Sequence, residues 1–161
     1  MIFHLSIEAD DAQRTAEVLA EIWGGKAMPF PFVGNGSWLA FSGADDGTLV
    51  EVYRRGTMMG IGEVEAIGVE QAPRRESATH FAMSTDLSAE QVHAIAEREG
   101  WPVRTCQRGD GIFGVIEVWI DGCNLVEVLT PEMQRQYLDS VTIANWQAGL
   151  AQFAEAQKLA A

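Results

Sequence analysis

The chain has 161 residues, of which 47% are apolar and 21% charged, a composition typical of a globular domain. Its net charge of −12 repels phosphate backbones and anionic lipid surfaces, which argues against nucleic-acid and membrane binding. No apolar run approaches the roughly 18 residues of a spanning helix, and the N-terminus turns acidic before a signal-peptide core could form. Cys106 and Cys123 fit no metal or redox spacing. We therefore expect a cytoplasmic protein with both thiols reduced.

The sequence contains an internal repeat. An ungapped shift of 76 residues places His4 on His80 and Glu51 on Glu127, so His and Glu are 47 residues apart in both halves. The same shift superimposes the LVEV segment at 49–52 on the LVEV segment at 125–128. Agreement of this kind is hard to obtain by chance, so we predict two homologous halves.

Each half predicts the element order βαβββ. The segments 2–8 and 78–84 alternate like strands, and a helix follows each of them. The first helix is capped by Asp10 or Asp11 and ends at Gly24, whereas the second begins with a capping box of Ser88 and Gln91 and ends at Gly100. Three further strands complete each half, at 26–33, 37–43 and 48–54 in the first and at 102–108, 112–120 and 124–130 in the second.

This pattern predicts an α+β fold with four segments. They are a first module at 1–54, a Gly- and charge-rich connector without clear period at 55–77, a second module at 78–130, and C-terminal helices at 131–161. The C-terminal segment predicts a short helix near 131–138, capped by Thr130, and a second helix near 142–158. The second helix carries an apolar stripe that is typical of a core or a homodimer contact, formed by Ile143, Trp146, Leu150 and Phe153.

His4 and Glu51 form one candidate pair of metal ligands, and His80 and Glu127 form its repeat. Alternate residues of a strand share a face, so the His and Glu of each half can point from the same concave side of a curved sheet. A Glu within an apolar strand is costly to bury unless a partner or a metal stabilises its charge. Two imidazoles and two carboxylates supply four positions around a divalent cation and leave two for water or substrate. We therefore predict a metal site.

The double βαβββ repeat with these four residues resembles the vicinal oxygen chelate superfamily, which includes glyoxalase I, methylmalonyl-CoA epimerase, extradiol dioxygenases and the fosfomycin and bleomycin resistance proteins. The ligand pattern is most similar to that of bacterial glyoxalase I. The resemblance covers residues 1–130. It implies two modules forming a cup-shaped mixed sheet, commonly in a homodimer, around a metal (Zn, Ni, Fe, Mn or Co) that chelates two neighbouring substrate oxygens.

The sequence departs from the glyoxalase pattern where glutathione is held. Glyoxalases carry an Arg shortly after the first metal His and an Asn shortly after the first metal Glu, and this chain has Glu8 and Arg55 at those places. A Glu facing the carboxylate of glutathione would repel it. We therefore expect a substrate other than a glutathione hemithioacetal.

The resemblance and the four residues together predict a metal-dependent lyase or isomerase. Such an enzyme transfers a proton on a small carbonyl substrate by way of an enediolate. Glu127 or Glu51 is the expected base, and Glu127 is slightly favoured because the C-terminal helices flank its strand. Other candidate groups around the substrate are Glu117 and the pocket residues Trp38, Tyr53, Arg55 and Trp119.

Two alternatives remain. One is a non-catalytic binding or resistance protein of the antibiotic type, in which an acidic cup holds a cationic small molecule. The other is a dioxygenase-like enzyme with Fe(II) on His4, His80 and Glu127. A dioxygenase of this kind also needs an acid-base His, and the remaining histidine, His93, falls on a predicted helix. The dioxygenase is therefore the weaker alternative. The sequence does not choose between a site within one chain and a site between two chains.

Overall fold

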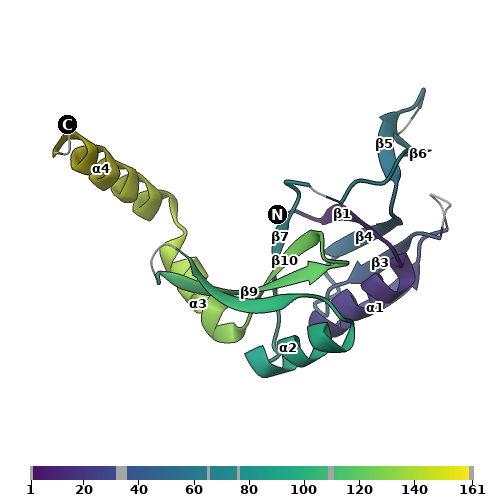
Figure 1. Cartoon of the computed structure of the whole chain (residues 1–161), viewed down its shortest axis with the longest axis horizontal. Coiled ribbons are helices and arrows are strands. Elements are labelled where there is room, and N and C mark those ends of the chain that lie inside the picture. Colours follow the sequence, from purple (N-terminus) through teal and green to yellow (C-terminus); the bar gives the residue numbers. More distant parts are fainter. Residues whose placement is uncertain (1, 32–35, 65, 76, 109–110, 160–161) are drawn as a thin grey trace.

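The computed structural model describes residues 2–31, 36–64, 66–75, 77–108 and 111–159. Its two βαβββ modules follow each other along the chain (Figure 1). The first module consists of β1 (His4–Ala9), α1 (Ala12–Ile22), β2 (Lys26–Pro29), β3 (Trp38–Phe41) and β4 (Leu49–Arg54). The second consists of β7 (Phe81–Ser84), α2 (Ala89–Arg98), β8 (Val103–Arg108), β9 (Phe113–Ile120) and β10 (Asn124–Leu129).

Each module forms a four-stranded mixed sheet with the same topology. The strand orders are β1-β4-β3-β2 and β7-β10-β9-β8, with the first and last strands of each module parallel and the other neighbours antiparallel. The turns before β4 and β10 also match, because Asp45 and Asp121 have positive φ angles of 51° and 53°. These observations confirm the predicted repeat and the α+β class.

Local sequence signals explain the helices. Asp11 accepts a hydrogen bond from the backbone of Arg14 at the start of α1, and Ser88 and Gln91 form the predicted capping box of α2. Gly24 and Gly100 follow the helices with φ angles of 67° and 71°, a conformation that glycine adopts without steric cost.

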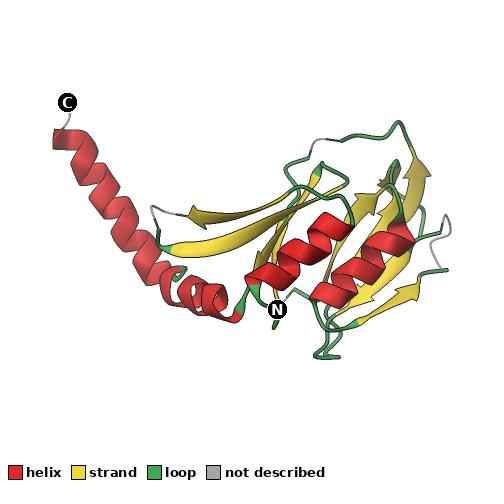
Figure 2. Ribbon diagram, turned by 60° about the horizontal axis from the view of Figure 1, so that its bottom comes forward, coloured by secondary structure: helices red, strands yellow, loops and turns green. Residues whose placement is uncertain are grey.

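The core lies between the two sheets and the helices that cover one face of them (Figure 2). Val50 and Val52 of β4 are fully buried on the helix side, and Val126 and Val128 occupy the same places in β10. Because strand residues alternate between faces, Glu51 and Glu127 lie on the opposite face of each sheet. The apolar alternation therefore decides which face carries the candidate site.

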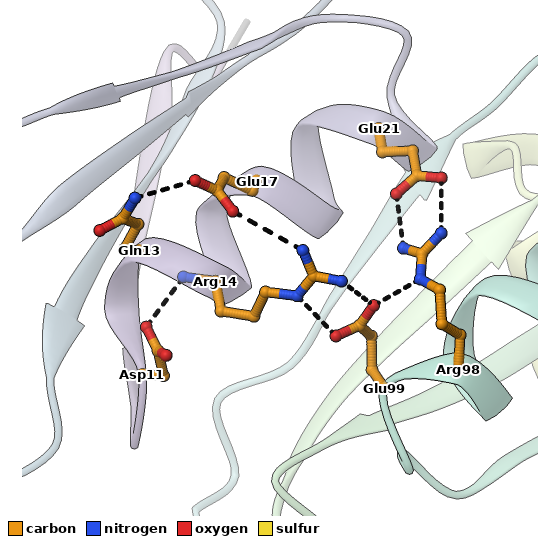
Figure 3. A network of polar contacts seen from close by, with 7 residues as sticks. All are labelled: Asp11, Gln13, Arg14, Glu17, Glu21, Arg98 and Glu99. Atoms are coloured by element: carbon orange, nitrogen blue, oxygen red, sulfur yellow. Dashed lines mark hydrogen bonds and ion pairs between the residues drawn. The ribbon is translucent and has the colours of Figure 1, made fainter.

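An ion-pair network joins the two modules through α1 and α2 (Figure 3). Arg14 contacts Glu17 of its own helix and Glu99 at the end of α2. Arg98 pairs with Glu21 at 2.6 Å and with Glu99 at 2.7 Å. The Glu99 side chain is only 8% exposed, so its charge is held by two guanidinium groups at the junction of the modules.

The connector contains two strands that the sequence did not indicate. β5 (Thr57–Ile61) and β6 (Ala66–Glu70) pair as an antiparallel hairpin that extends away from the two sheets (Figure 1). Gly60 and Gly68 interrupt the alternation of apolar residues that would otherwise have predicted these strands. A Cβ at Gly60 would come within 2.9 Å of a methyl group of Val69, which explains the glycine there. The predicted strand 26–33 is shorter than expected, since β2 ends at Pro29, and residues 32 and 33 lie outside the described residues.

The C-terminal segment forms α3 (Pro131–Ser140) and α4 (Ile143–Leu159). Thr130 caps α3 and Pro131 occupies its first turn, as predicted. α4 extends away from the sheets (Figures 1 and 2), with Ile143 81% and Trp146 66% exposed. The apolar stripe of this helix is therefore not part of the core of a single chain. The side chain of Phe153, the fourth residue of the stripe, is not among those that the structure describes. No helix in the described ranges is long and apolar enough to cross a membrane.

Candidate functional site

The first candidate site lies on β1 and β4, which are parallel neighbours. Ser6 is in register with Glu51, and both side chains occupy the face turned away from α1. The Ser6 hydroxyl donates a hydrogen bond of 2.8 Å to Oε2 of Glu51, and the Tyr53 hydroxyl donates one of 2.9 Å to the same oxygen. Oε1 faces the ring of His4, whose Nε2 lies 3.9 Å away. We call His4, Ser6, Glu51 and Tyr53 the first half-site.

Hydrogen bonds orient the Glu51 carboxylate, and most but not all of it is shielded from solvent. Its side chain is 16% exposed, whereas that of His4 is 56% exposed. Because both hydroxyl donors bind Oε2, the carboxylate is fixed in one rotation and Oε1 is left for other partners. This arrangement offers one oxygen and one imidazole nitrogen side by side on an accessible surface.

Tyr53 is a permanent hydrogen-bond donor in this half-site. Burial raises the pKa of its phenol to about 12, and the hydrogen bond to the Glu51 carboxylate acts in the same direction. The phenol therefore keeps its proton throughout the physiological range.

The second half-site consists of His80 and Glu127 and differs from the first. His80 immediately precedes β7, is exposed, and has Nδ1 3.0 Å from the carbonyl oxygen of Ala78. Oε1 of Glu127 receives a hydrogen bond of 2.5 Å from Arg108, whose guanidinium also contacts Oε1 of Glu117 at 2.6 Å. The carboxylate that corresponds to Glu51 is thus part of an ion-pair network.

Glu117 is the most buried carboxylate of this network, at 4% exposure. Burial would raise its pKa, but hydrogen bonds from Arg108, Arg104 and Trp119 reverse that effect and lower the pKa to about 2. Glu117 therefore remains charged at neutral pH and acts as the anchor for both arginines.

The four predicted ligands do not meet within one chain. His4 and Glu51 belong to one sheet and His80 and Glu127 flank or belong to the other, and these sheets are not joined by a strand ladder. Among the residues that the structure describes, no group of three or more His, Cys, Asp or Glu is placed to hold a metal ion. Within the described part of a single chain, His4 lies beside Glu51, and no four-ligand centre forms.

A cleft of 590 Å³ adjoins the first half-site. Ser6 and Tyr53 form part of its wall, and Glu8 lies beside them on β1. The connector also lines the cleft, with Met58, Met59, Arg74 and Arg75. It thus helps to enclose the space next to Ser6 and Tyr53, the hydroxyl donors to Glu51.

The other predicted pocket residues have different surroundings. Arg55 lines the cleft, but it is only 6% exposed and pairs with Asp10 at 2.5 Å and Asp121 at 2.8 Å, which links the two modules. Trp38 packs against the core. Trp119 donates a hydrogen bond of 3.4 Å to Glu117 and lies in the second sheet, away from the cleft beside Glu51.

Sequence reasoning missed Arg104 and Arg108. Both lie on β8, where residues 104, 106 and 108 share one face and the residues between them face the helices. Arg104 is in register with Glu117, so both arginines lie on the same face of the sheet as Glu117. Glu117 and Glu127 lie opposite each other on β9 and β10, and such a pair of carboxylates requires a nearby cation. This requirement could have predicted the arginines, but the pairing follows only from the strand register, which the sequence does not give.

No protein-family model matches the sequence, and no curated protein is significantly similar to it. Solved structures are similar in fold. The fosfomycin resistance protein FosX from Mesorhizobium loti has 13% identity and a TM-score of 0.52, with 86% of this chain and 97% of that chain covered. A point mutant of FosX from Listeria monocytogenes, complexed with Mn(II) and 1S,2S-dihydroxypropylphosphonic acid, has 12% identity, a TM-score of 0.55 and coverages of 86% and 97%.

A trypanothione-dependent glyoxalase I from Leishmania major is also similar, with 16% identity, a TM-score of 0.50 and coverages of 86% and 92%. These likenesses extend over both modules of the chain. They agree with the paired βαβββ topology and with the resemblance that the His and Glu repeat suggested. The chain therefore has the same fold as FosX and glyoxalase I.

Proposed function

We propose that this protein is a metal-dependent enzyme that transfers a proton on a small carbonyl substrate, in the manner of a lyase or isomerase. The observation that supports this most directly is the geometry of Glu51. One of its oxygens is held by the hydroxyl groups of Ser6 and Tyr53, which line a cleft, and the other faces His4. A partly exposed carboxylate that is fixed in orientation beside a cleft is suited to accept a proton from a bound substrate.

Glu51 is the better candidate for the base, although the sequence slightly favoured Glu127. The guanidinium of Arg108 already occupies Oε1 of Glu127, so that oxygen is not open to a substrate proton. Ser6 and Tyr53 act on Oε2 of Glu51, which leaves Oε1 to accept the proton. Ser6 and Tyr53 are therefore positioning residues, since they act through the Glu51 carboxylate that they hold.

A divalent cation fits the donor set of the first half-site. Nε2 of His4 is a nitrogen donor, and His80 and Glu127 offer a nitrogen and an oxygen donor in the second module. Oε1 of Glu51, 3.9 Å from Nε2 of His4, would be a further donor only while it is not accepting the proton. Zn, Ni, Fe, Mn and Co all accept such ligands, and the Mn(II) complex of a FosX neighbour supports this assignment. When bound, the metal would polarise the substrate carbonyl and lower the barrier to proton removal from the adjacent carbon.

A homodimer would complete the site. Each module contributes one His and one Glu of the repeat, so the first module of one copy facing the second module of another could gather four donors. The exposed stripe of α4 supports such an assembly, because Ile143, Trp146 and Leu150 leave an apolar surface uncovered in the single chain.

Exchange of substrate C–H protons with deuterated water tests the proposed reaction. Small α-hydroxyketones, hemithioacetals and acyl-CoA thioesters are incubated with metal-loaded protein, and deuterium incorporation is followed by NMR. We expect exchange with at least one class and a roughly 100-fold loss in Glu51→Gln, the scale of general-base removal. Glu127→Gln serves as the matched control and should lose less. Absence of exchange with every class would reject the enzyme.

A non-catalytic binding protein is the second candidate. It is favoured by the pairing of Glu127 with Arg108 and by the lack of a three-donor group in the described part of one chain. The cleft is not uniformly acidic, because Arg74 and Arg75 line it with Glu8, so a purely cationic ligand is not indicated. Elemental analysis of protein purified without added metal separates the two candidates, since the enzyme should retain a divalent metal and the binder should not.

The dioxygenase alternative gains no support. Its three ligands would be His4, His80 and Glu127, and these are divided between the two half-sites. His93, its candidate acid-base residue, lies on α2 with Nε2 3.0 Å from the hydroxyl of Thr105, on the helix side of the second sheet.

A further inference from the structure

The outer half of the β5–β6 hairpin presents apolar side chains on both of its faces. Ile61 is fully exposed and Met59 half exposed on one face, whereas Ile67, which pairs with Gly60, is half exposed on the other. The two strands form a sheet of their own. A two-stranded hairpin is marginally stable in water unless it packs against another element. We therefore expect a partner surface to cover this hairpin.

A second uncovered apolar surface lies beside α4. A groove of 700 Å³ is lined by Ile112 and Phe113 at the start of β9 and by Trp146, Gly149 and Leu150 on α4. Ile112, Trp146 and Leu150 are each more than half exposed. Gly149 follows Trp146 by nearly one helical turn and carries no side chain, which widens the groove between Trp146 and Leu150. The groove can thus receive apolar side chains from a partner.

The hairpin and α4 lie at opposite ends of the molecule, and both extend away from the side that α1 and α2 cover (Figure 1). A two-fold rotation about an axis midway between these two ends exchanges them. The hairpin of one copy then meets α4 of the second copy, and the hairpin of the second copy meets α4 of the first. Such an assembly closes after two copies, whereas the same contact without a two-fold axis would continue into a filament.

The two surfaces together are large enough for a stable dimer. Six apolar side chains, each about half exposed or more, supply several hundred Å² in every chain, the same order as the ~800 Å² that each partner of a stable complex buries. They are Met59, Ile61 and Ile67 on the hairpin and Ile112, Trp146 and Leu150 at the groove. Because the two-fold contact covers both surfaces of both copies, it leaves none of this apolar area exposed to water.

We propose that two copies of this chain form a two-fold dimer in which the hairpin of each copy packs into the groove beside α4 of the other. The hairpin follows the first module along the chain, and α4 follows the second. The contact therefore joins the first module of one copy to the second module of the other, which is the pairing that a shared four-donor site requires. The inference rests on the proposed function only in its homodimer and needs neither a metal nor a reaction.

Chemical cross-linking of the full chain tests which surfaces meet. Ile61→Cys/Leu150→Cys is made in a background with Cys106→Ser and Cys123→Ser and treated with a short bismaleimide. We expect a covalent dimer and no larger product. The single variants Ile61→Cys and Leu150→Cys in the same background should remain uncross-linked.

Each other result of the cross-linking contradicts the proposal. A cross-linked Leu150→Cys variant would show that α4 packs against α4, and a cross-linked Ile61→Cys variant would show that hairpin meets hairpin. A ladder of larger products from the double variant would show an open chain of copies instead of a closed dimer. Absence of a covalent dimer from the double variant would also overturn the contact.

Two substitutions of Ile61 test whether the contact holds the dimer together. Light scattering of Ile61→Asp at micromolar concentration should shift from twice the chain mass toward 17.6 kDa. Ile61→Thr keeps a β-branched residue that favours the strand, and should raise the dimer dissociation constant roughly tenfold because the lost contact occurs twice. Ala94→Asp places a charge at an exposed position of α2 and should leave the dimer unchanged. Unaltered dimerisation of both Ile61 variants would disprove the role of the hairpin.

The outcome is distinguishable from failure of the proposed enzyme. A covalent dimer of the double variant, with no proton exchange by wild type, would support the hairpin contact and reject the enzyme. Proton exchange by a wild-type dimer that Ile61→Asp does not dissociate would support the enzyme and reject the hairpin contact. A wild-type monomer without proton exchange would reject both.

Discussion

Glu51 and Glu127 occupy equivalent places in the two halves of the chain, yet Glu51 accepts hydrogen bonds from two hydroxyl groups whereas Glu127 forms an ion pair with Arg108. The difference originates one strand away, where Leu39 lies opposite Glu51 and Glu117 lies opposite Glu127. The two modules therefore share a backbone and differ in chemistry. The open carboxylate belongs to the first module, and residues of both modules and of the connector line the cleft beside it.

Loss of either hydroxyl donor to Glu51 should slow the proposed proton exchange. We expect Ser6→Ala and Tyr53→Phe each to lower kcat by roughly 10-fold with little change in KM, because Oε1 is no longer held toward the substrate. Ser6→Thr restores a hydroxyl and should recover most of the rate. Tyr137→Phe is the control, since that ring packs against Phe113 in the second module. Unchanged kcat in both donor variants would contradict the positioning role.

The Glu117 network should make stability depend on pH in the acid range. The pKa of Glu117 in the folded protein is about 2, against an ordinary value of 4.5. A lowered folded pKa means that this group stabilises the fold above about pH 4.5 and that the contribution is lost as the pH falls toward 2.

Urea unfolding at pH 7 and pH 3 measures this effect. Glu117→Gln should lower the free energy of unfolding by about 1–3 kcal/mol at pH 7, because a buried hydrogen-bonded charge is lost. The difference from wild type should shrink at pH 3. Glu155→Gln on exposed α4 is the control and should change stability little at either pH. A difference that stays constant between the two pH values would contradict the assignment.

Arg55 should stabilise the junction of the modules rather than bind substrate. Its guanidinium is 6% exposed and bridges Asp10 and Asp121, which belong to different modules. Arg55→Met should lower the free energy of unfolding by about 2–4 kcal/mol, because Asp121 loses its partner in a shielded position. The neighbouring Arg54 is exposed and provides the control variant Arg54→Met. Equal stability of the two variants in thermal and urea unfolding would disprove the role.

The α4 stripe should mediate homodimer formation. Light scattering of wild-type protein should give twice the chain mass of 17.6 kDa at micromolar concentration. Trp146→Asp and Leu150→Asp should shift the mass toward 17.6 kDa, since a charge on the stripe opposes burial. Gln152→Asp adds the same charge at an exposed position outside the stripe and should leave the mass unchanged. A wild-type monomer would count against the dimer.

The sequence by itself determined the repeated module and much of its local structure. The 76-residue offset, the alternation around Glu51 and Glu127, the Asp11 cap and the Ser88–Gln91 capping box all reside in short stretches of chain. Their physical causes are local, because strand alternation and helix capping depend on residues within a few positions of each other.

The tertiary structure decided which groups meet. The pairing of Arg108 with Glu127 and of Arg55 with Asp121 joins residues 19 and 66 positions apart, and each depends on strand register or on the packing of the two modules. The connector hairpin was hidden because Gly60 and Gly68 interrupt its apolar pattern. The four His and Glu residues look alike in the repeat, but only packing in three dimensions separates an open carboxylate from one held by an arginine.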